Sequence, residues 1–215
     1  MADVIYSPLK GKVLRVIRLD ECGAPVTGTE GLVVSDGFIQ VQFSPQYKDG
    51  EEFLVTNANG DLVVNEQDPA RLKRIDVTIQ MSGIDPAAFE IMLGVDPMTA
   101  GDDLVGMLFG EAPNTTKFGL EVWGGVSGQA CIGGEASFEH LALGILENAK
   151  FGDSATMYGP TDLTITASSH KAPDYGTGPF DLLPTPFGPS DHMARYVTQV
   201  DPPDIVAGYQ TLTLV

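Results

Sequence analysis

The sequence predicts a mainly β fold, a sandwich or partly open barrel with one short flanking α-helix and long inter-strand loops. Three observations predict it. Segments of alternating apolar and polar residues recur along the chain, 25 Gly and 15 Pro separate them, and one segment carries the signals for both ends of a helix. A length of 215 residues suits a single domain over residues 1–215.

The first strands are expected at residues 12–19, 32–34 and 38–43. Residues 12–19 are rich in Val, Leu and Ile and end at a turn-like segment. Residues 38–43 alternate, so that one face is apolar. A loop is expected at residues 44–50.

A β-hairpin is predicted around Asn59-Gly60, a dipeptide that favours a type I′ turn because both central residues need a positive φ. Acidic and amide residues surround its short apolar strands, and an isolated hairpin is barely stable in water, so this one must lean on something else. The candidate subunit-contact residues of this hairpin are Phe53, Leu54, Val55, Asn59, Gly60, Leu62 and Val63.

The strongest strand pattern covers residues 72–82, where polar and apolar residues alternate. Its polar face consists of Arg74, Asp76, Thr78 and Gln80.

A short helix is expected to follow this strand. Asp85 can cap its N-terminus, Pro86 fits the first helical position, and Gly94 fits the left-handed position after its end. Phe89 and Met92, three residues apart, begin an apolar stripe.

The remaining strands are expected at residues 118–123, 161–168, 193–200 and 211–215. Residues 137–150 fit either a helix or a strand; because Gly144 interrupts the helical pattern, we predict a strand through Leu146.

Three long segments stand out: the 44–71 hairpin excursion, residues 95–116 with an apolar island, and the Pro/Gly-rich loop at 171–192. Loops of about 20 residues are unusual in a compact domain unless they have a function. They could be buried against another subunit or could cover the sheet edges of a monomer. The residues leave these two interpretations open.

Charge and composition exclude several classes. The chain has 29 Asp+Glu against 12 Lys+Arg, a net charge of −17, which opposes tight binding of nucleic-acid phosphates. No stretch reaches the roughly 20 apolar residues of a membrane span, and no signal peptide is visible at the N-terminus. With only two cysteines, Cys22 and Cys131, reduced thiols and a cytoplasmic origin are the plainer interpretation.

No catalytic, metal-binding or cofactor-binding residues are predicted. Residues 125–129 resemble a nucleophile elbow but end in Gln129 where Gly is needed, and Ser7-Pro8-Leu9-Lys10 lacks companion motifs. His140, His170 and His192 show no helical metal-binding spacing, so solvated or locally hydrogen-bonded roles are expected for them.

The order of several motifs resembles the major tail (tail tube) proteins of long-tailed bacteriophages, especially those infecting actinobacteria. The main block runs from Arg71 through Ile84-Asp85-Pro86 to Leu93-Gly94, a strand followed by Asp-Pro and a short helix. Residues 19–25, 34–38 and 176–183, the Asn59-Gly60 hairpin and Asp191-His192 extend the resemblance over nearly the whole chain. Residues 135–152 match less clearly, and the extra immunoglobulin-like domain of some relatives is absent.

This resemblance implies a structural virion protein without enzymatic activity or cofactor. Six copies would form a ring whose inner strands join into a barrel, and stacked rings would form the hollow tail tube through which DNA passes to the host. The implied partners are further copies of the chain, the tape measure, tail terminator and distal tail proteins, and double-stranded DNA in transit without tight binding. Assembly is expected in the host cytoplasm and residence in the virion tail.

Two further hypotheses follow for the residues. Segment 44–71 would bridge subunits or rings, and the polar face Arg74, Asp76, Thr78 and Gln80 becomes a candidate channel wall. The alternatives are a head–tail connector, a capsid-decoration protein, or a cytoplasmic β-sandwich enzyme or carbohydrate-binding module. A single Trp and unclustered Tyr residues argue against the last of these.

Overall fold

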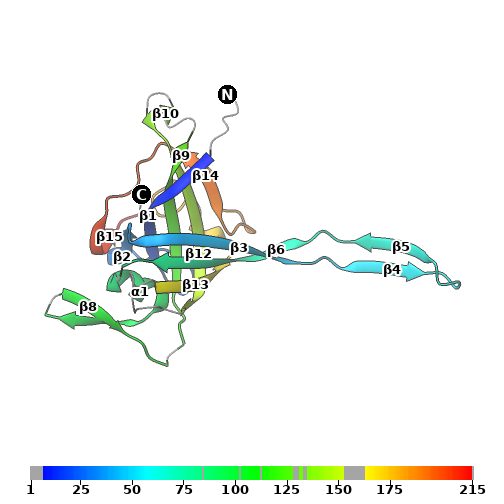
Figure 1. The fold of residues 1–215 in the computed structure, drawn as a ribbon, viewed down its shortest axis with the longest axis horizontal. Coiled ribbons are helices and arrows are strands. Elements are labelled where there is room, and N and C mark those ends of the chain that lie inside the picture. The colour runs from blue at the N-terminus through cyan, green and yellow to red at the C-terminus, as the bar shows by residue number, and fades with distance from the viewer. Residues whose placement is uncertain are drawn as a thin grey trace.

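A large, curved antiparallel sheet organises the computed structural model, and a long two-stranded arm extends from it (Figure 1). The structure describes residues 7–83, 85–101, 103–111, 113–127, 131–132, 135–152 and 163–214. The predicted mainly β class with one short helix is confirmed, with 59% of the structure in strands.

The sheet has nine strands, eight of them in the order β15-β2-β1-β9-β12-β13-β6-β3. Their bounds are β1 Ser7–Leu19, β2 Gly28–Ser35, β3 Phe38–Lys48, β6 Arg71–Met81, β9 Lys117–Ser127, β12 Phe138–Phe151, β13 Leu163–His170 and β15 Val206–Leu212. The ninth strand, β14 (Ala194–Thr198), pairs with the first half of β12, whereas β13 pairs with the second half. Along the described residues the hydrogen-bonded path ends at β15 and β3 and does not close into a barrel.

The remaining strands form two-stranded units: β4 (Glu52–Thr56) with β5 (Leu62–Gln67), β7 (Asp96–Ala100) with β8 (Asp103–Leu108), and the short β10 (Cys131–Ile132) with β11 (Glu135–Ala136). A 3-10 turn, Pro173–Tyr175, begins the segment that crosses the sheet before β14.

Helix α1 (Pro86–Leu93) fills one side of the curved sheet. Phe89 and Met92 are fully buried there among apolar residues from β1, β6, β9, β12 and β13. The curvature brings distant strands together: a Cβ on Gly11 of β1 would lie 3.0 Å from the Phe38 ring of β3, five places away in the sheet order.

The opposite side of the sheet is divided in two. Over β2, β1, β9 and β12 it is mainly apolar with a few buried charged and polar residues, and the 172–187 segment covers it with Tyr175, Leu183 and Phe187. Over β13, β6 and β3 it is polar and uncovered. The loop predicted at 171–192 therefore covers the sheet face of its own chain rather than projecting toward a partner.

The helix and several strands predicted from local signals are confirmed. Asp85 accepts a hydrogen bond from the Ala87 N–H at 3.1 Å, Pro86 occupies the first turn, and Gly94 has a left-handed φ of 62°. The strand predicted through Leu146 is confirmed and continues to Phe151.

Four expectations are wrong. Residues 44–48 continue β3 rather than forming a loop, because Pro45 lies on an edge strand where its missing N–H is tolerated. Segment 95–116 contains the β7–β8 hairpin, and the last strand is β15 rather than residues 211–215.

The fourth concerns the turn of the 53–64 hairpin, where only Gly60 has a positive φ, of 88°. Gly60 N–H bonds Asn57 O at 3.0 Å, and the Asn57 side chain accepts from Asn59 N–H and Asp61 N–H. The connection is thus a turn followed by a left-handed glycine, and not the type I′ turn expected from Asn-Gly.

No helix in the described segments is long and apolar enough to cross a membrane.

Candidate functional site

Both sets of residues singled out in the sequence lie on one long ribbon. β3 pairs with β6 in the body of the molecule, and the chain between them continues outward as the β4–β5 arm (Figure 1). The hydrogen bond from Asp68 N–H to Glu51 O, 2.9 Å long, carries the pairing across the base of the arm. The apolar hairpin residues therefore occupy its far part and the polar face occupies its body part.

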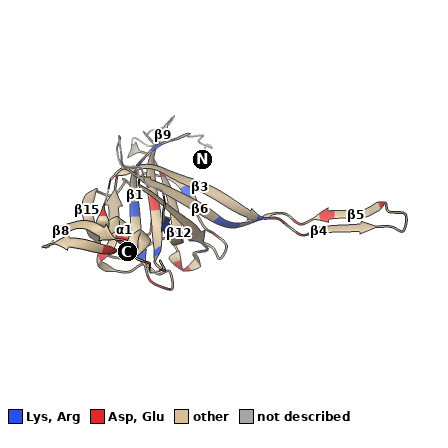
Figure 2. Cartoon of the chain, turned by 60° about the horizontal axis from the view of Figure 1, so that its bottom comes forward, with Lys and Arg blue, Asp and Glu red and all other residues tan. Residues whose placement is uncertain are grey.

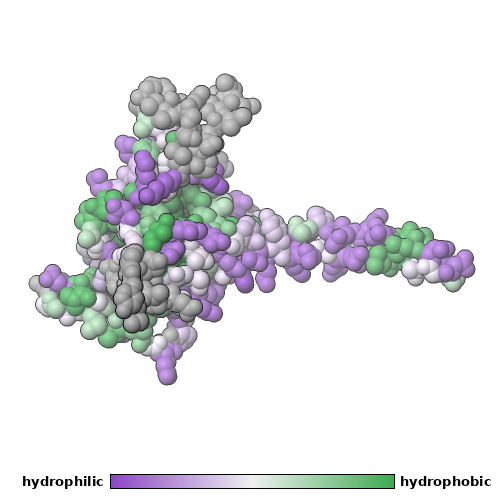
Figure 3. Space-filling model, viewed as in Figure 1, coloured by the Kyte–Doolittle hydropathy of each residue, from purple (hydrophilic) through white to green (hydrophobic). Residues whose placement is uncertain are grey.

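The arm leaves its apolar side chains in solvent. Figure 3 shows a hydrophobic patch near its end, between hydrophilic stretches. The five apolar candidates for a subunit contact, Phe53, Leu54, Val55, Leu62 and Val63, are each 49–62% exposed. The expectation that this hairpin must lean on another surface is therefore not met within its own chain.

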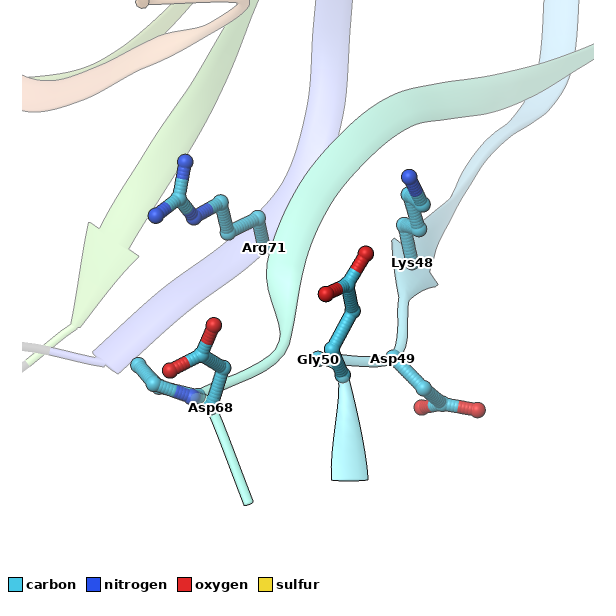
Figure 4. Close-up of a pocket in the computed structure, with 7 residues that line it drawn as sticks. Lys48, Asp49, Gly50, Asp68 and Arg71 are labelled. Carbon is cyan, nitrogen blue, oxygen red and sulfur yellow. The ribbon is translucent and has the colours of Figure 1, made fainter. Parts of the chain in front are cut away.

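A close backbone approach marks the base of the arm. A hollow of about 330 Å³ lies there, and in Figure 4 the side chains of Lys48, Asp68 and Arg71 surround Gly50. A Cβ on Gly50 would lie 1.9 Å from the Asp68 carbonyl oxygen. The two backbone segments at the base of the arm can therefore approach this closely only with glycine at position 50.

The polar face of β6 continues onto both neighbouring strands. Cross-strand partners share a face of a sheet, and Thr78 stands between Gln42 of β3 and Thr166 of β13. The next rows are Gln40–Gln80–Thr164 and Ser44–Asp76–Ser168. The result is a broad surface of short, mainly uncharged polar side chains.

Arg74 and Asp76 pair with each other on this face, and Lys150 lies opposite Thr166. Arg74 Nε donates to Asp76 Oδ1 at 2.8 Å, and Ser168 Oγ donates to the same oxygen at 3.0 Å. Thr78 and Gln80 are half-buried, and the residues that alternate with them, such as Val77 and Ile79, are buried in the core. The predicted alternation of β6 is thus confirmed.

A buried ionic cluster, which the sequence analysis did not single out, lies under the 172–187 segment. Arg15 and Glu121 are direct cross-strand partners on β1 and β9, and they are 5% and 2% exposed. Arg15 Nε donates to Glu121 Oε2 at 2.8 Å, and its Nη2 donates to the same oxygen. Tyr175 OH donates to Glu121 Oε1 at 3.0 Å, which ties the covering segment to the sheet.

His140 extends this cluster along β12. Its ring stacks on Trp123 with centroids 4.2 Å apart, and its Nε2 lies 3.9 Å from Glu121 Oε2. Its Nδ1 hydrogen-bonds the Tyr196 hydroxyl, which donates to Leu182 O at 2.8 Å. Because that hydroxyl proton is already used, Nδ1 is the donor to Tyr196.

Burial governs the protonation of these groups. It lowers the pKa of His140 from 6.5 to about 4, with Glu121 opposing and Arg15 reinforcing the shift. Burial, then the Glu121 carboxylate, raise the pKa of Tyr175 well above its ordinary value, and burial raises that of Tyr196 to about 12. Arg15, Glu121 and His140 are at most 5% exposed, so the cluster presents no accessible nucleophile or base. It holds the covering segment in place.

The other histidines are paired locally. His170 Nε2 lies 2.9 Å from Glu147 Oε1, and His192 Nδ1 lies 2.9 Å from Ser169 Oγ. Among the residues that the structure describes, no three His, Cys, Asp or Glu side chains are grouped as a metal would need. Cys22 is an exposed free thiol. The Gln129 motif position falls outside the described residues, and Ser7 begins β1 opposite Ser127.

One sequence signal could have revealed the buried cluster. Arg15 and Glu121 each interrupt an apolar strand segment, at residues 12–19 and 118–123, and a charge in such a place needs a partner when buried. Their pairing depends on strand register across 106 residues, which the sequence alone does not give.

A comparison of the chain with protein families and with curated proteins found no family model and no curated relative that matches it.

Proposed function

We propose that this chain is a structural subunit that polymerises as stacked hexameric rings into the hollow tail tube of a long-tailed bacteriophage. The observation that carries the proposal is the β4–β5 arm. It extends away from the body and ends in half-exposed apolar side chains, including Phe53, Leu54 and Val63. An exposed apolar patch of this kind marks a surface for another protein, and here it bridges to the next subunit or ring.

The two open ends of the main sheet support ring formation. β15 and β3 end the hydrogen-bonded path, and unpaired strand edges are templates for pairing with another chain. Head-to-tail contacts close into a ring when the rotation closes, whereas stacking contacts between unlike faces continue into a filament. One chain thus offers separate surfaces for the ring and for the stack.

The polar face of β13, β6 and β3 supplies the channel wall in this proposal. Arg74 and Asp76 pair with each other there, Thr78 and Gln80 are uncharged, and Lys150 beside Thr166 is the one further cation among the residues named for this surface. A wall of this kind offers DNA phosphates few cations to bind, and the net charge of −17 opposes their retention. Double-stranded DNA passes without tight binding.

The location and the partners of the subunit follow from that role. The subunit resides in the virion tail after assembly in the host cytoplasm. Its partners are other copies of itself, the tape measure protein within the tube, and the terminator and distal tail proteins at the two ends.

Negative-stain electron microscopy of the purified protein, with light scattering to measure mass, tests the proposal. We expect hollow polymers from the full chain. A variant with residues 51–68 replaced by a two-residue Asn-Gly turn should remain folded by circular dichroism but fail to stack. Isolated rings or capped trimers from the full chain would favour a connector or decoration protein, and monomers at all concentrations would contradict assembly altogether.

A further inference from the structure

A second hollow, of about 250 Å³, opens where β6, β12 and β13 meet the start of the covering segment. Its lining includes Lys73 and Arg74 from β6, His170 from β13, and Lys171 and His192 from the segment that follows. These residues make it a cationic site in a chain that has more than twice as many acids as bases.

His192 lines this hollow with a buried side chain. Its side chain is 4% exposed, and its Nε2 has no hydrogen-bond partner among the described residues. Ser169 Oγ accepts from Ile75 N–H at 2.8 Å and lies 2.9 Å from His192 Nδ1. A buried polar atom without a hydrogen-bond partner costs free energy, so the Nε2 of His192 is a candidate contact for a ligand of the hollow.

Two acids at or near the hollow, Glu147 in its lining and Asp76 beside it, are already paired with other groups. Glu147 pairs with His170 at 2.9 Å, and Asp76 pairs with Arg74 at 2.8 Å. Within the described part of the chain, no ion pair within 4.0 Å involves Lys73 or Lys171. Burial, followed by the charges of Lys171 and His170, lowers the pKa of His192, and the Asp191 carboxylate opposes the shift.

The arm carries the complementary charge. Residues 49–68 contain six acids, Asp49, Glu51, Glu52, Asp61, Glu66 and Asp68, and no Lys or Arg. Figure 2 shows basic residues where β3 and β6 leave the body and acidic ones farther along the arm. The arm extends away from the body of its own chain (Figure 1), so the carboxylates of β4 and β5 are placed to reach such a site on another copy.

We propose that the hollow lined by Lys73, Lys171 and His192 binds carboxylates of the β4–β5 arm from a second copy of this chain. The inference rests on the proposed function. It names the acceptor in the stacking contact, which is the surface of one copy that receives the arm of the next copy. Glu52 of β4 and Glu66 of β5 supply the anion. Both are exposed, and they lie on opposite faces of the arm, so either face can present a carboxylate. The ammonium groups of Lys73 and Lys171 attract these carboxylates.

Zero-length carbodiimide coupling tests this contact in the full-length protein. It joins a lysine amine to a carboxylate only when the two are in direct contact. In an equal mixture of ¹⁴N- and ¹⁵N-labelled chains, mass spectrometry should find mixed-isotope links from Lys73 or Lys171 to Glu52, Glu66 or another acid of the arm. Links from the arm only to lysines outside the hollow would overturn the proposal.

Charge reversal gives an independent test. Lys73→Glu with Lys171→Glu should abolish the coupling and reduce assembly at least tenfold, as should Glu52→Lys with Glu66→Lys. All four substitutions in one chain should restore assembly, because the charges are complementary again. The matched control is Lys10→Glu with Lys12→Glu, which changes the net charge equally on β1 and should assemble like the parent.

The two proposals fail differently. If the full chain forms tubes and the reversed hollow forms them equally well, the tube stands and the acceptor is wrong. If the full chain forms no tubes but the arm-to-hollow links appear at high concentration, the acceptor stands and the tube is wrong. If neither tubes nor links appear, both are wrong. Binding of a double-stranded oligonucleotide that is lost in Lys73→Glu with Lys171→Glu would assign the hollow to phosphate and overturn the carboxylate proposal.

Discussion

Glu121 joins two parts of the molecule that are far apart in the sequence. One carboxylate oxygen pairs with Arg15 of β1 and the other accepts from Tyr175 of the covering segment. A buried ion pair adds little net stability when intact, but removing one partner leaves the other charge uncompensated. The stability of the covered half of the sheet therefore depends on this single side chain.

Glu121→Gln should lower the free energy of unfolding by about 3–5 kcal/mol, because it keeps the volume but leaves Arg15 buried without a counterion. Urea unfolding followed by circular dichroism measures the loss. The matched control is Glu139→Gln, whose partner Arg195 has a side chain 54% exposed. It should cost less than about 1 kcal/mol. Equal losses in the two variants would contradict the assigned importance of Glu121.

His140 makes stability depend on pH. Its pKa is about 4 in the folded chain against 6.5 for the ordinary group, so the unfolded chain takes up a proton first as the pH falls. The stabilisation is complete above about pH 6.5 and is lost as the pH falls toward 4. His192, whose pKa is also lowered, acts in the same direction.

His140→Gln should remove a part of the pH dependence on the order of 2 kcal/mol between pH 7 and pH 5. Urea unfolding at the two pH values measures it, and the variant is expected to lose less stability on acidification than the parent. An unchanged difference, or an NMR titration placing the His140 imidazole near 6.5, would show that burial does not depress this pKa.

The arm and the body have different dependence on glycine. Gly50 allows the two backbone segments at the base of the arm to approach closely. A Cβ added at Gly83, after β6, would have no atom within 4 Å. The arm has no core of its own, so its order depends on pairing between β4 and β5 and on this base. The arm can therefore lose its pairing while the body stays folded.

Gly50→Ala should separate the arm strands at their base and speed amide hydrogen exchange in β4 and β5 by about tenfold or more. Exchange in β6 and β12 should stay as in the parent, because the sheet core does not include the arm. Gly83→Ala serves as the control and should leave both regions unchanged. Arm exchange that is equal in the two variants would count against the close approach at Gly50.

Elements with local signals could be predicted from the sequence, and those that depend on distant neighbours could not. Asp85, Pro86 and Gly94 define α1 within one short segment, and alternation in residues 72–82 defines both faces of β6. The loop expected at residues 44–50 is wrong for residues 44–48, because tolerance of Pro45 in β3 depends on its edge position in the finished sheet. In the same way, Arg15 and Glu121 become partners only through the register of β1 and β9.

The candidate sites also differ in whether local patterns or distant neighbours define them. The apolar hairpin and the polar face were visible as patterns, and the structure adds that they share one ribbon. The 171–192 segment could not be assigned from composition, since burial of Tyr175 and Phe187 depends on the sheet beneath it. The hollow around His192 likewise combines residues from three separate parts of the chain.

The polar face offers a test of how DNA would travel through the assembled protein. If β6 lines the channel, Thr78→Lys with Gln80→Lys should leave tube assembly intact and slow genome ejection from virions that carry the variant, because added cations retain phosphates. Thr78→Glu with Gln80→Glu should eject at the parental rate. Thr99→Lys with Ala100→Lys, on the exposed β7, is the control for added charge elsewhere.

Two results would contradict this placement. Ejection at the parental rate with the lysine variant would remove β6 from the channel, and so would a map of the assembly with Thr78 and Gln80 on the outer surface. The acidity of the chain would then act in keeping free subunits apart before assembly, since like charges oppose association.

The position of α1 has a consequence for any conduit. The curved sheet encloses a space, but Phe89, Met92 and their neighbours fill it to full burial, so a single chain contains no passage. A bore can exist only between copies, and its diameter is then set by how many chains share the ring. Substitutions in this core would change the folding stability of each copy and leave the diameter of the channel unchanged.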